Sequence, residues 1–256
     1  MKIEEKVNPE LHIKPFDNQM KGSSQVHPDL PQHPFTILAV CPKGGGKTTN
    51  IIRLIWGNKK CKETKVDKGY HKFYRHFFSR IFVFSPTWAL DDKTRRCKIP
   101  EDQIFDDPST YDEILQEIVA GQIEDKENGE LEPVLLIFSD LAGSSLFSLR
   151  KDSVINRLAF NSRHFGISML LDSQSLRQIS NPFRENLSAV LLFGGISNRL
   201  ELKKIYDEFL GRYNEKEAKK IMEYVFKDSP YNFLTINFQQ RGRLFRNWNP
   251  LEISDV

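Results

Sequence analysis

The sequence has little cysteine and no long apolar segment. Its three cysteines are Cys41, Cys61 and Cys97, and their spacing does not fit a metal site. We therefore expect reduced thiols in an intracellular protein, not a disulfide framework. No apolar run reaches the 18 residues of a membrane-spanning helix, so we expect no membrane span. The start of the chain carries Glu4 and Glu5 and lacks the apolar segment of a secretory signal, so we expect no such signal.

Internal repeats are also missing, and charge is distributed unevenly along the 256 residues. Residues 58–80 contain eight lysines and arginines against two acidic residues, whereas residues 101–132 contain twelve acidic residues against one lysine. Both segments suit a solvated surface. The basic run also carries aromatic residues, a combination that suits nucleic acid, although Phe77 and Phe78 equally suit the approach to the next strand.

The first 34 residues differ in composition from the rest. They contain five prolines and no periodic apolar face, so we expect residues 1–34 to form an extended arm that wraps a neighbour or is partly disordered. Residues 35–256 then form one domain, with a helical and hairpin extension from about residue 198. Hydrophobic residues make up 39% of the chain, enough for a sizeable core.

Short apolar runs alternate with helical patterns, which predicts a three-layer α/β fold with a mainly parallel sheet. Ser109 is expected to cap a helix that ends before Gly121, and Arg241-Gly242 to turn a hairpin. The predicted strands span 35–40, 81–84, 134–138, 167–171, 189–193, 233–238 and 244–248, and further helices are expected after the loop at 41–48 and near 152–161, 199–210 and 215–226.

The strongest motif is a glycine-rich loop between the first strand and the first helix. Backbone N–H groups of such a loop converge on phosphate oxygens, and the helix N-terminus adds positive charge. Lys47 is expected to be exposed in the empty loop and to reach the β- and γ-phosphates of ATP, with the Thr48 hydroxyl on Mg²⁺. Cys41 departs from the phosphate-loop pattern, which has glycine there. The predicted nucleotide-binding residues are Pro42, Lys43, Gly44, Gly45, Gly46, Lys47, Thr48 and Thr49.

The apolar run 135–138 is followed by Ser139 and Asp140. In ATPases of the additional-strand type, such a run precedes an aspartate near Mg²⁺ and then an acid that activates water. Ser139 then stands at the Mg²⁺ position and Asp140 at the water-activating position. Alternatively, Asp140 takes the metal role and Leu141 stands where the base should be. Either alignment makes slow or absent hydrolysis a possibility.

Two further side chains are candidates for contact with the γ-phosphate. Gln174 lies just beyond the predicted strand 167–171, where an amide can sense this phosphate; a plain surface amide is the alternative. Arg184 is our candidate for an arginine finger that completes a neighbouring subunit's site, and Arg163 is the alternative. A surface ion pair remains open for each arginine.

These motifs, in this order, resemble those of the virion genome-packaging ATPases of large DNA viruses and virophages. This is the poxvirus-type branch of the FtsK–HerA superfamily, and the resemblance covers roughly residues 30–210. It rests on Leu30-Pro31-Gln32-His33-Pro34-Phe35, the phosphate loop, Phe82-Val83-Phe84-Ser85-Pro86-Thr87 with Asp91-Asp92, Leu135–Asp140, Asn161–Ser168, Gln174 and Arg184.

The resemblance implies a RecA-like P-loop ATPase whose core strands run in the order 5-1-4-3-2, with the glutamine strand between the loop strand and the strand before Asp140. It also implies a homo-oligomeric ring, a pentamer or hexamer, that uses ATP and Mg²⁺ to move double-stranded DNA non-specifically into a preformed capsid. The further partners are capsid or portal-vertex proteins, and the location is the virion or the viral factory in the host cytoplasm. Cys41 and Ser139 depart from the family pattern.

Two other classes of function compete with a DNA motor. A small-molecule kinase would need lid arginines and an acceptor pocket, and the sequence marks neither. A catalytically weakened nucleotide-binding scaffold that docks on capsid protein is favoured by Ser139. Turnover with and without DNA separates the three.

Overall fold

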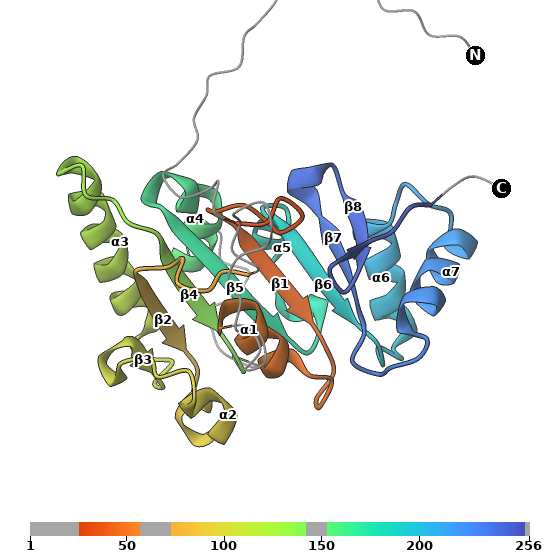
Figure 1. The fold of residues 1–256 in the computed structure, drawn as a ribbon, viewed down its shortest axis with the longest axis horizontal. Coiled ribbons are helices and arrows are strands. Elements are labelled where there is room, and N and C mark those ends of the chain that lie inside the picture. Colours follow the sequence, from red (N-terminus) through yellow and green to blue (C-terminus); the bar gives the residue numbers. More distant parts are fainter. Residues whose placement is uncertain (1–25, 57–72, 142–152, 254–256) are drawn as a thin grey trace, which may run out of the picture.

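The computed structural model describes residues 26–56, 73–141 and 153–253, which form an α/β fold around a nine-stranded, mainly parallel sheet (Figure 1). The strands lie in the order β3-β2-β4-β5-β1-β6-β7-β8-β9. Their bounds are β1 Thr36–Val40, β2 Arg80–Phe84, β3 Ile104–Phe105, β4 Val134–Phe138, β5 Ile167–Ser173, β6 Ala189–Phe193, β7 Phe233–Asn237, β8 Arg243–Arg246 and β9 Asn249–Pro250. The predicted fold class is confirmed.

The central strands follow the order expected for a P-loop ATPase of the additional-strand type. Reading from β6, the order is β6-β1-β5-β4-β2, with β5 between β1 and β4, and these strands are all parallel. The whole sheet differs in detail, because the short β3 pairs outside β2 and the antiparallel strands β7 to β9 extend the other edge. Because the central strands are parallel, their carboxyl ends all lie on one side of the sheet, which we call its carboxyl edge. The loop after β1 lies at this carboxyl edge.

Helices cover both faces of the sheet. The alternating side chains of β4 show the division, since Leu136 and Phe138 belong to one buried cluster and Leu135 and Ile137 to the other. Helix α1 packs in the second cluster and lies in front of the sheet in Figure 1, whereas α3 to α7 contribute buried residues to the first. The α-helices are α1 Lys47–Trp56, α2 Asp92–Arg95, α3 Tyr111–Glu127, α4 Val154–Asn161, α5 Asn181–Arg184, α6 Arg199–Phe209 and α7 Glu215–Phe226.

Helix α3 corrects our expectation that a helix would end before Gly121. It begins after Thr110 and continues through Gly121 to Glu127. A glycine inside a helix costs only about 1 kcal/mol, so tertiary contacts can outweigh it. Here the next residue, Gln122, is buried and donates hydrogen bonds to the carbonyls of Glu132 and Phe165.

The segment 26–34, which composition assigned to an arm, packs against its own domain. Val26 and Leu30 are buried, and the Tyr74 hydroxyl donates a hydrogen bond to the Pro31 carbonyl at 2.6 Å. Tyr74 and Phe77 of the aromatic run are themselves buried, so they belong to the core and are not available to nucleic acid. Residues 1–25 and most of the basic run, 57–72, lie outside the described residues.

No helix in the described ranges combines the length and the apolar character needed to cross a membrane.

Candidate nucleotide site

The loop between β1 and α1 has the backbone geometry that its glycines predict. Gly44 and Gly46 adopt φ of +80° and +96°, a region that side chains with a Cβ rarely enter. The Gly45 N–H donates to the Pro42 carbonyl at 3.1 Å, and the Asn50 N–H donates to the Gly46 carbonyl at 2.9 Å. The loop therefore leads directly into the N-terminus of α1, the feature of the fold that attracts phosphate.

Cys41 is accommodated because Gly45 has no side chain. Cys41 is fully buried at the end of β1, and burial raises the pKa of its thiol to about 11, with the nearby Lys47 charge acting in the opposite direction. A Cβ added at Gly45 would lie 2.3 Å from the Cys41 Sγ, so close that the sulfur or the loop would have to shift. The sulfur atom therefore fills the space beneath the loop, and the thiol is neutral at ordinary pH.

Lys47, the first residue of α1, is turned inward. Its side chain is only 10% exposed, and its Nζ lies 3.7 Å from the Asp172 Oδ1, so the expectation of an exposed lysine in an empty loop is wrong. Thr48 follows it and is half-buried, while Thr49 lines a neighbouring pocket. Lys43 is exposed at the outer side of the loop.

Asp172 is the site residue that the sequence analysis missed. It lies near the end of β5, and its carboxylate accepts a 2.6 Å hydrogen bond from the Ser139 hydroxyl and a 3.3 Å bond from the Asp140 N–H. Burial raises the pKa of Asp172, while the Lys47 charge and the Ser139 hydrogen bond lower it. The sequence could have indicated Asp172 as an aspartate on the strand next to β1. The predicted strand 167–171 ended one residue before it, so Asp172 was not considered.

Asp140 lies beside this cluster but is exposed. Its φ is +58°, a left-handed conformation that aspartate tolerates better than most residues and that often marks functional sites. Its Oδ2 accepts a 3.0 Å hydrogen bond from the Thr87 hydroxyl, on the segment after β2. Lys47, Ser139 and Asp140 thus all contact Asp172, which brings these three residues together. Gln174 is exposed just beyond β5, at the same edge of the sheet.

Arg184 does not match its predicted role as an arginine finger. The residue is 6% exposed, and its Nε donates to the Glu208 Oε1 at 2.6 Å, which joins α5 to α6. Its other nitrogens donate to the carbonyls of Leu176 and Ile179 and to the side chain of Asn181. A guanidinium with this many partners inside its own subunit has no free donor fork for a neighbour's phosphate.

The alternative finger, Arg163, is exposed. It belongs to a short 3₁₀ helix, Ser162–Phe165, that leads into the amino end of β5. The phosphate loop follows the carboxyl end of β1, which is parallel to β5. Arg163 therefore lies at the opposite edge of the sheet from its own phosphate loop.

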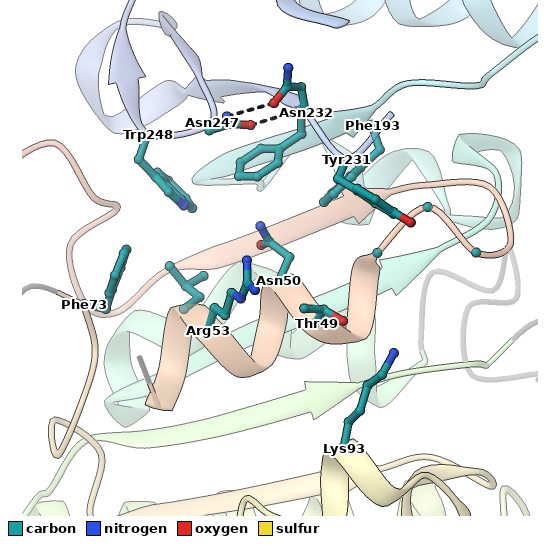
Figure 2. Close-up of a pocket in the computed structure, with 15 residues that line it drawn as sticks. Thr49, Asn50, Arg53, Phe73, Lys93, Phe193, Tyr231, Asn232, Asn247 and Trp248 are labelled. Carbon is teal, nitrogen blue, oxygen red and sulfur yellow. Dashed lines mark hydrogen bonds between the residues drawn. The ribbon is translucent and has the colours of Figure 1, made fainter. Parts of the chain in front are cut away.

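A pocket of about 580 Å³ opens beside the loop (Figure 2). Asn50 and Arg53 point into it from α1, and Tyr231 lies over the loop, close enough that a Cβ at Gly46 would come within 3.3 Å of its ring. The far wall is aromatic and belongs to the C-terminal extension. The lining residues are Gly44, Gly45, Gly46, Thr49, Asn50, Arg53, Leu54, Phe73, Lys93, Phe193, Tyr231, Asn232, Phe233, Asn247 and Trp248.

The donor atoms near the loop fit Mg²⁺, which prefers oxygen ligands. The Thr48 hydroxyl and the carboxylates of Asp140 and Asp172 belong to this class. Within residues 26–56, 73–141 and 153–253, no three His, Cys, Asp or Glu side chains gather as a metal cluster. This fits Mg²⁺ as well, because the ion is commonly held by one or two carboxylates together with the phosphates of the nucleotide.

The sheet order, the loop and the acidic cluster together define a P-loop NTPase fold of the additional-strand type. No protein-family profile and no curated protein sequence matches the chain. Among solved structures, the genome-packaging NTPase B204 of Sulfolobus turreted icosahedral virus 2, in complex with ATP-γ-S, is 15% identical with a TM-score of 0.55 over 85% of this chain and 98% of its own.

A crystal structure of B204, described as the DNA-packaging ATPase of Sulfolobus turreted icosahedral virus, gives a similar result. It is 16% identical, with a TM-score of 0.57 over 86% of this chain and 99% of its own. The B204 complex with sulfate aligns with the same TM-score of 0.57 over 87% of this chain. The resemblance to viral packaging ATPases is confirmed at the level of the fold.

Proposed function

We propose that this chain is an ATPase that binds ATP with Mg²⁺ at the loop between β1 and α1. The observation that carries the proposal is the convergence of three features at one edge of the sheet: the phosphate loop, the acidic cluster around Asp172, and the adjoining pocket. A pocket of about 580 Å³ is within the size range of small-ligand sites. The loop glycines Gly44, Gly45 and Gly46 line this pocket, and in this proposal it holds the nucleoside.

Each residue of the site has a role that follows from its position. Backbone N–H groups of the loop and the N-terminus of α1 hold the phosphates, and Lys47 turns from Asp172 toward them. Thr48 supplies a hydroxyl to Mg²⁺, which supplies charge neutralisation at the β- and γ-phosphates. Asp140 is exposed beside Asp172, and in this proposal its carboxylate accepts a proton from the attacking water. Gln174, exposed just beyond β5, is the proposed sensor of the γ-phosphate.

ATP hydrolysis in this proposal drives double-stranded DNA into a preformed viral capsid. The fold shared with B204 over nearly the whole of that chain supports this, as does the basic run at residues 58–80. The working form is a ring of five or six copies with the ATP sites between subunits, docked on capsid or portal-vertex protein. The protein then acts in the virion or in the viral factory of the host cytoplasm.

Ser139 supports a second function. A serine at the end of β4 leaves that position uncharged, and a site with too little negative charge beside Mg²⁺ would bind nucleotide without efficient turnover. In this alternative, the chain is a nucleotide-binding scaffold that docks on capsid protein.

The deciding experiment is ATP turnover with and without double-stranded DNA, on a sample whose oligomeric state has been measured. A DNA motor gives turnover that DNA stimulates, whereas the scaffold binds ATP and does not hydrolyse it. Lys47→Ala is the matched control, because it removes phosphate contacts and should abolish ATP binding. Unchanged ATP affinity in Lys47→Ala would contradict the assignment of the loop.

A further inference from the structure

We propose that Asp172 supplies the carboxylate that holds Mg²⁺ with the nucleotide, in place of the acid missing at position 139. The inference rests on the proposed nucleotide site and deepens it. It moves the acidic residue from the end of β4 to the end of β5, one strand nearer to the phosphate loop.

The register of the sheet allows an acid on β5 to take the place of an acid at the end of β4. Phe138 pairs with Leu171, so Ser139 and Asp172 are the next residues on neighbouring parallel strands. Asp172 also pairs with Ala39 of β1, two residues before the loop begins. Adjacent strands lie about 4.8 Å apart, so a carboxylate on β5 reaches the space that an acid on β4 would otherwise serve.

The contacts of Asp172 orient its carboxylate toward the loop. Ser139 acts as a hydrogen-bond donor to Oδ2 at 2.6 Å, and the Asp140 N–H donates to Oδ1 at 3.3 Å. The side chain of Asp172 is only 2% exposed, and Lys47 is the cation beside it, at 3.7 Å. Ser139 therefore positions the acid and does not replace it.

The pairing with Lys47 changes when a nucleotide binds. Lys47 must turn toward the phosphates, and a buried carboxylate that loses its cation is costly, more so beside phosphate oxygens. A divalent cation restores the balance of charge. Asp172 should therefore oppose the binding of metal-free ATP and favour the binding of ATP with Mg²⁺.

The test measures the affinity of the full chain for a non-hydrolysable ATP analogue, with Mg²⁺ and in the presence of a chelator. Asp172→Asn keeps the shape of the side chain and can keep its bond to Ser139. We expect metal-free affinity to rise about tenfold, equivalent to about 1.4 kcal/mol, and the gain from Mg²⁺ to disappear. A purely structural role for Asp172 would lower both affinities together.

The double variant Ser139→Asp with Asp172→Ser moves the acid back to β4 and keeps one aspartate and one serine in the pair. It should regain the Mg²⁺ dependence that Asp172→Asn loses, and it serves as the test if the single variant fails to fold. Asp140→Asn tests the alternative in which Asp140 holds the metal. If Asp172 holds it, Asp140→Asn should retain the Mg²⁺ dependence of binding. Mn²⁺ bound with the analogue gives an independent readout through its electron paramagnetic resonance spectrum, which should change in Asp172→Asn.

Two results would overturn the inference. Full Mg²⁺ dependence in Asp172→Asn, with its loss in Asp140→Asn, would make Asp140 the metal residue. A double variant that folds but lacks Mg²⁺ dependence would show that the two positions are not equivalent. Wild-type protein that binds no analogue at any Mg²⁺ concentration would instead refute the proposed function, and the inference with it.

Discussion

Cys41 and Gly45 depend on each other, because the Cys41 sulfur occupies the space that a side chain at position 45 would need. Gly45 has no positive φ, so its need for glycine is steric and comes chiefly from the Cys41 Sγ. Gly45→Ala should push the loop out of shape and lower ATP affinity by about tenfold or more, or about 1.4 kcal/mol. Adding Cys41→Ala removes the sulfur and leaves only the Pro42 carbonyl, at 3.3 Å, as a close neighbour.

Titration calorimetry on both variants checks this coupling. The double variant should recover most of the lost affinity, and Cys41→Ala alone should change it little. Equal losses in the single Gly45→Ala and the double variant would contradict the steric explanation.

His33 is a buried titratable group outside the site. Its Nδ1 lies 2.7 Å from the Ser168 hydroxyl oxygen, and burial lowers its pKa to about 4 from 6.5. A pKa lowered by folding stabilises the protein above pH 6.5, and this contribution is lost as the pH falls from 6.5 toward 4. The loss amounts to about 3 kcal/mol of unfolding free energy at pH 4.

Chemical denaturation of wild type and His33→Gln across this range tests the prediction. The difference in unfolding free energy should be constant above pH 6.5 and shrink below it. A difference that stays constant down to pH 4 would show that folding does not lower the pKa of His33.

The site residues divide into those that a local motif reveals and those that need the fold. Lys47 and Thr48 follow a glycine-rich loop and are recognisable from their immediate neighbours. Asp172 becomes part of the site only through the pairing of β5 with β1 and β4. The ion pair of Arg184 with Glu208 is equally hidden in the sequence, because Glu208 is 24 residues away on another helix. Sequence spacing alone shows neither contact.

At the scale of elements, the apolar runs predicted every central strand and the final hairpin. Buried parallel strands are apolar on both faces, so β1, β4 and β6 appear as continuous hydrophobic runs. The end of α3 could not be predicted in this way, because Gly121 is a local breaker whose effect the buried Gln122 outweighs. Short strands such as β3 were also missed, since two residues carry no periodic signal.

The hairpin of β7 and β8 does more than extend the sheet, because residues flanking its strands form a wall of the pocket beside the loop. Tyr231 precedes β7, is 63% exposed and lies against Gly46. If the pocket holds the nucleoside, stacking on this ring contributes about 1–3 kcal/mol. Tyr231→Ala should then weaken ATP binding about tenfold or more and leave tripolyphosphate binding unchanged.

Competition binding with the two ligands measures this difference. Tyr224→Ala is the matched control, since Tyr224 is half-exposed on α7 and does not line the pocket. Equal weakening of ATP and tripolyphosphate in Tyr231→Ala would mean that the ring supports the loop and not the base.

At the scale of the whole molecule, the two edges of the sheet have different surroundings. The carboxyl edge carries the phosphate loop and the acidic cluster, and the amino edge carries exposed Arg163 and a cavity of about 460 Å³ lined in part by Phe160 and Glu185. Phe160 is 54% exposed, which is unusual for so large an apolar side chain. An arginine and an apolar residue together suit contact with another subunit.

We predict that Arg163 acts on the ATP site of a neighbouring subunit and not on its own. The seven residues of β5 separate the two edges by about 20 Å, too far for an arginine side chain to reach its own phosphate loop. In a ring, the same arginine can stabilise charge developing on a neighbour's γ-phosphate. Arg163→Ala should therefore leave ATP binding by the isolated subunit intact and remove DNA-stimulated turnover by the ring.

Mixed rings decide whether the arginine acts between subunits. Subunits with Arg163→Ala and subunits with Lys47→Ala should each be inactive alone, because every interface then lacks either an arginine or a functional loop. Together they should regain part of the turnover, since some interfaces pair an intact Lys47 with an intact Arg163 from the next subunit. Arg184→Ala separates this role from a structural one: it should lower the unfolding temperature, because Glu208 loses its partner, whereas Arg163→Ala should not. Mixed rings confirmed by mass spectrometry that show no recovery would exclude Arg163 as the residue acting across the interface.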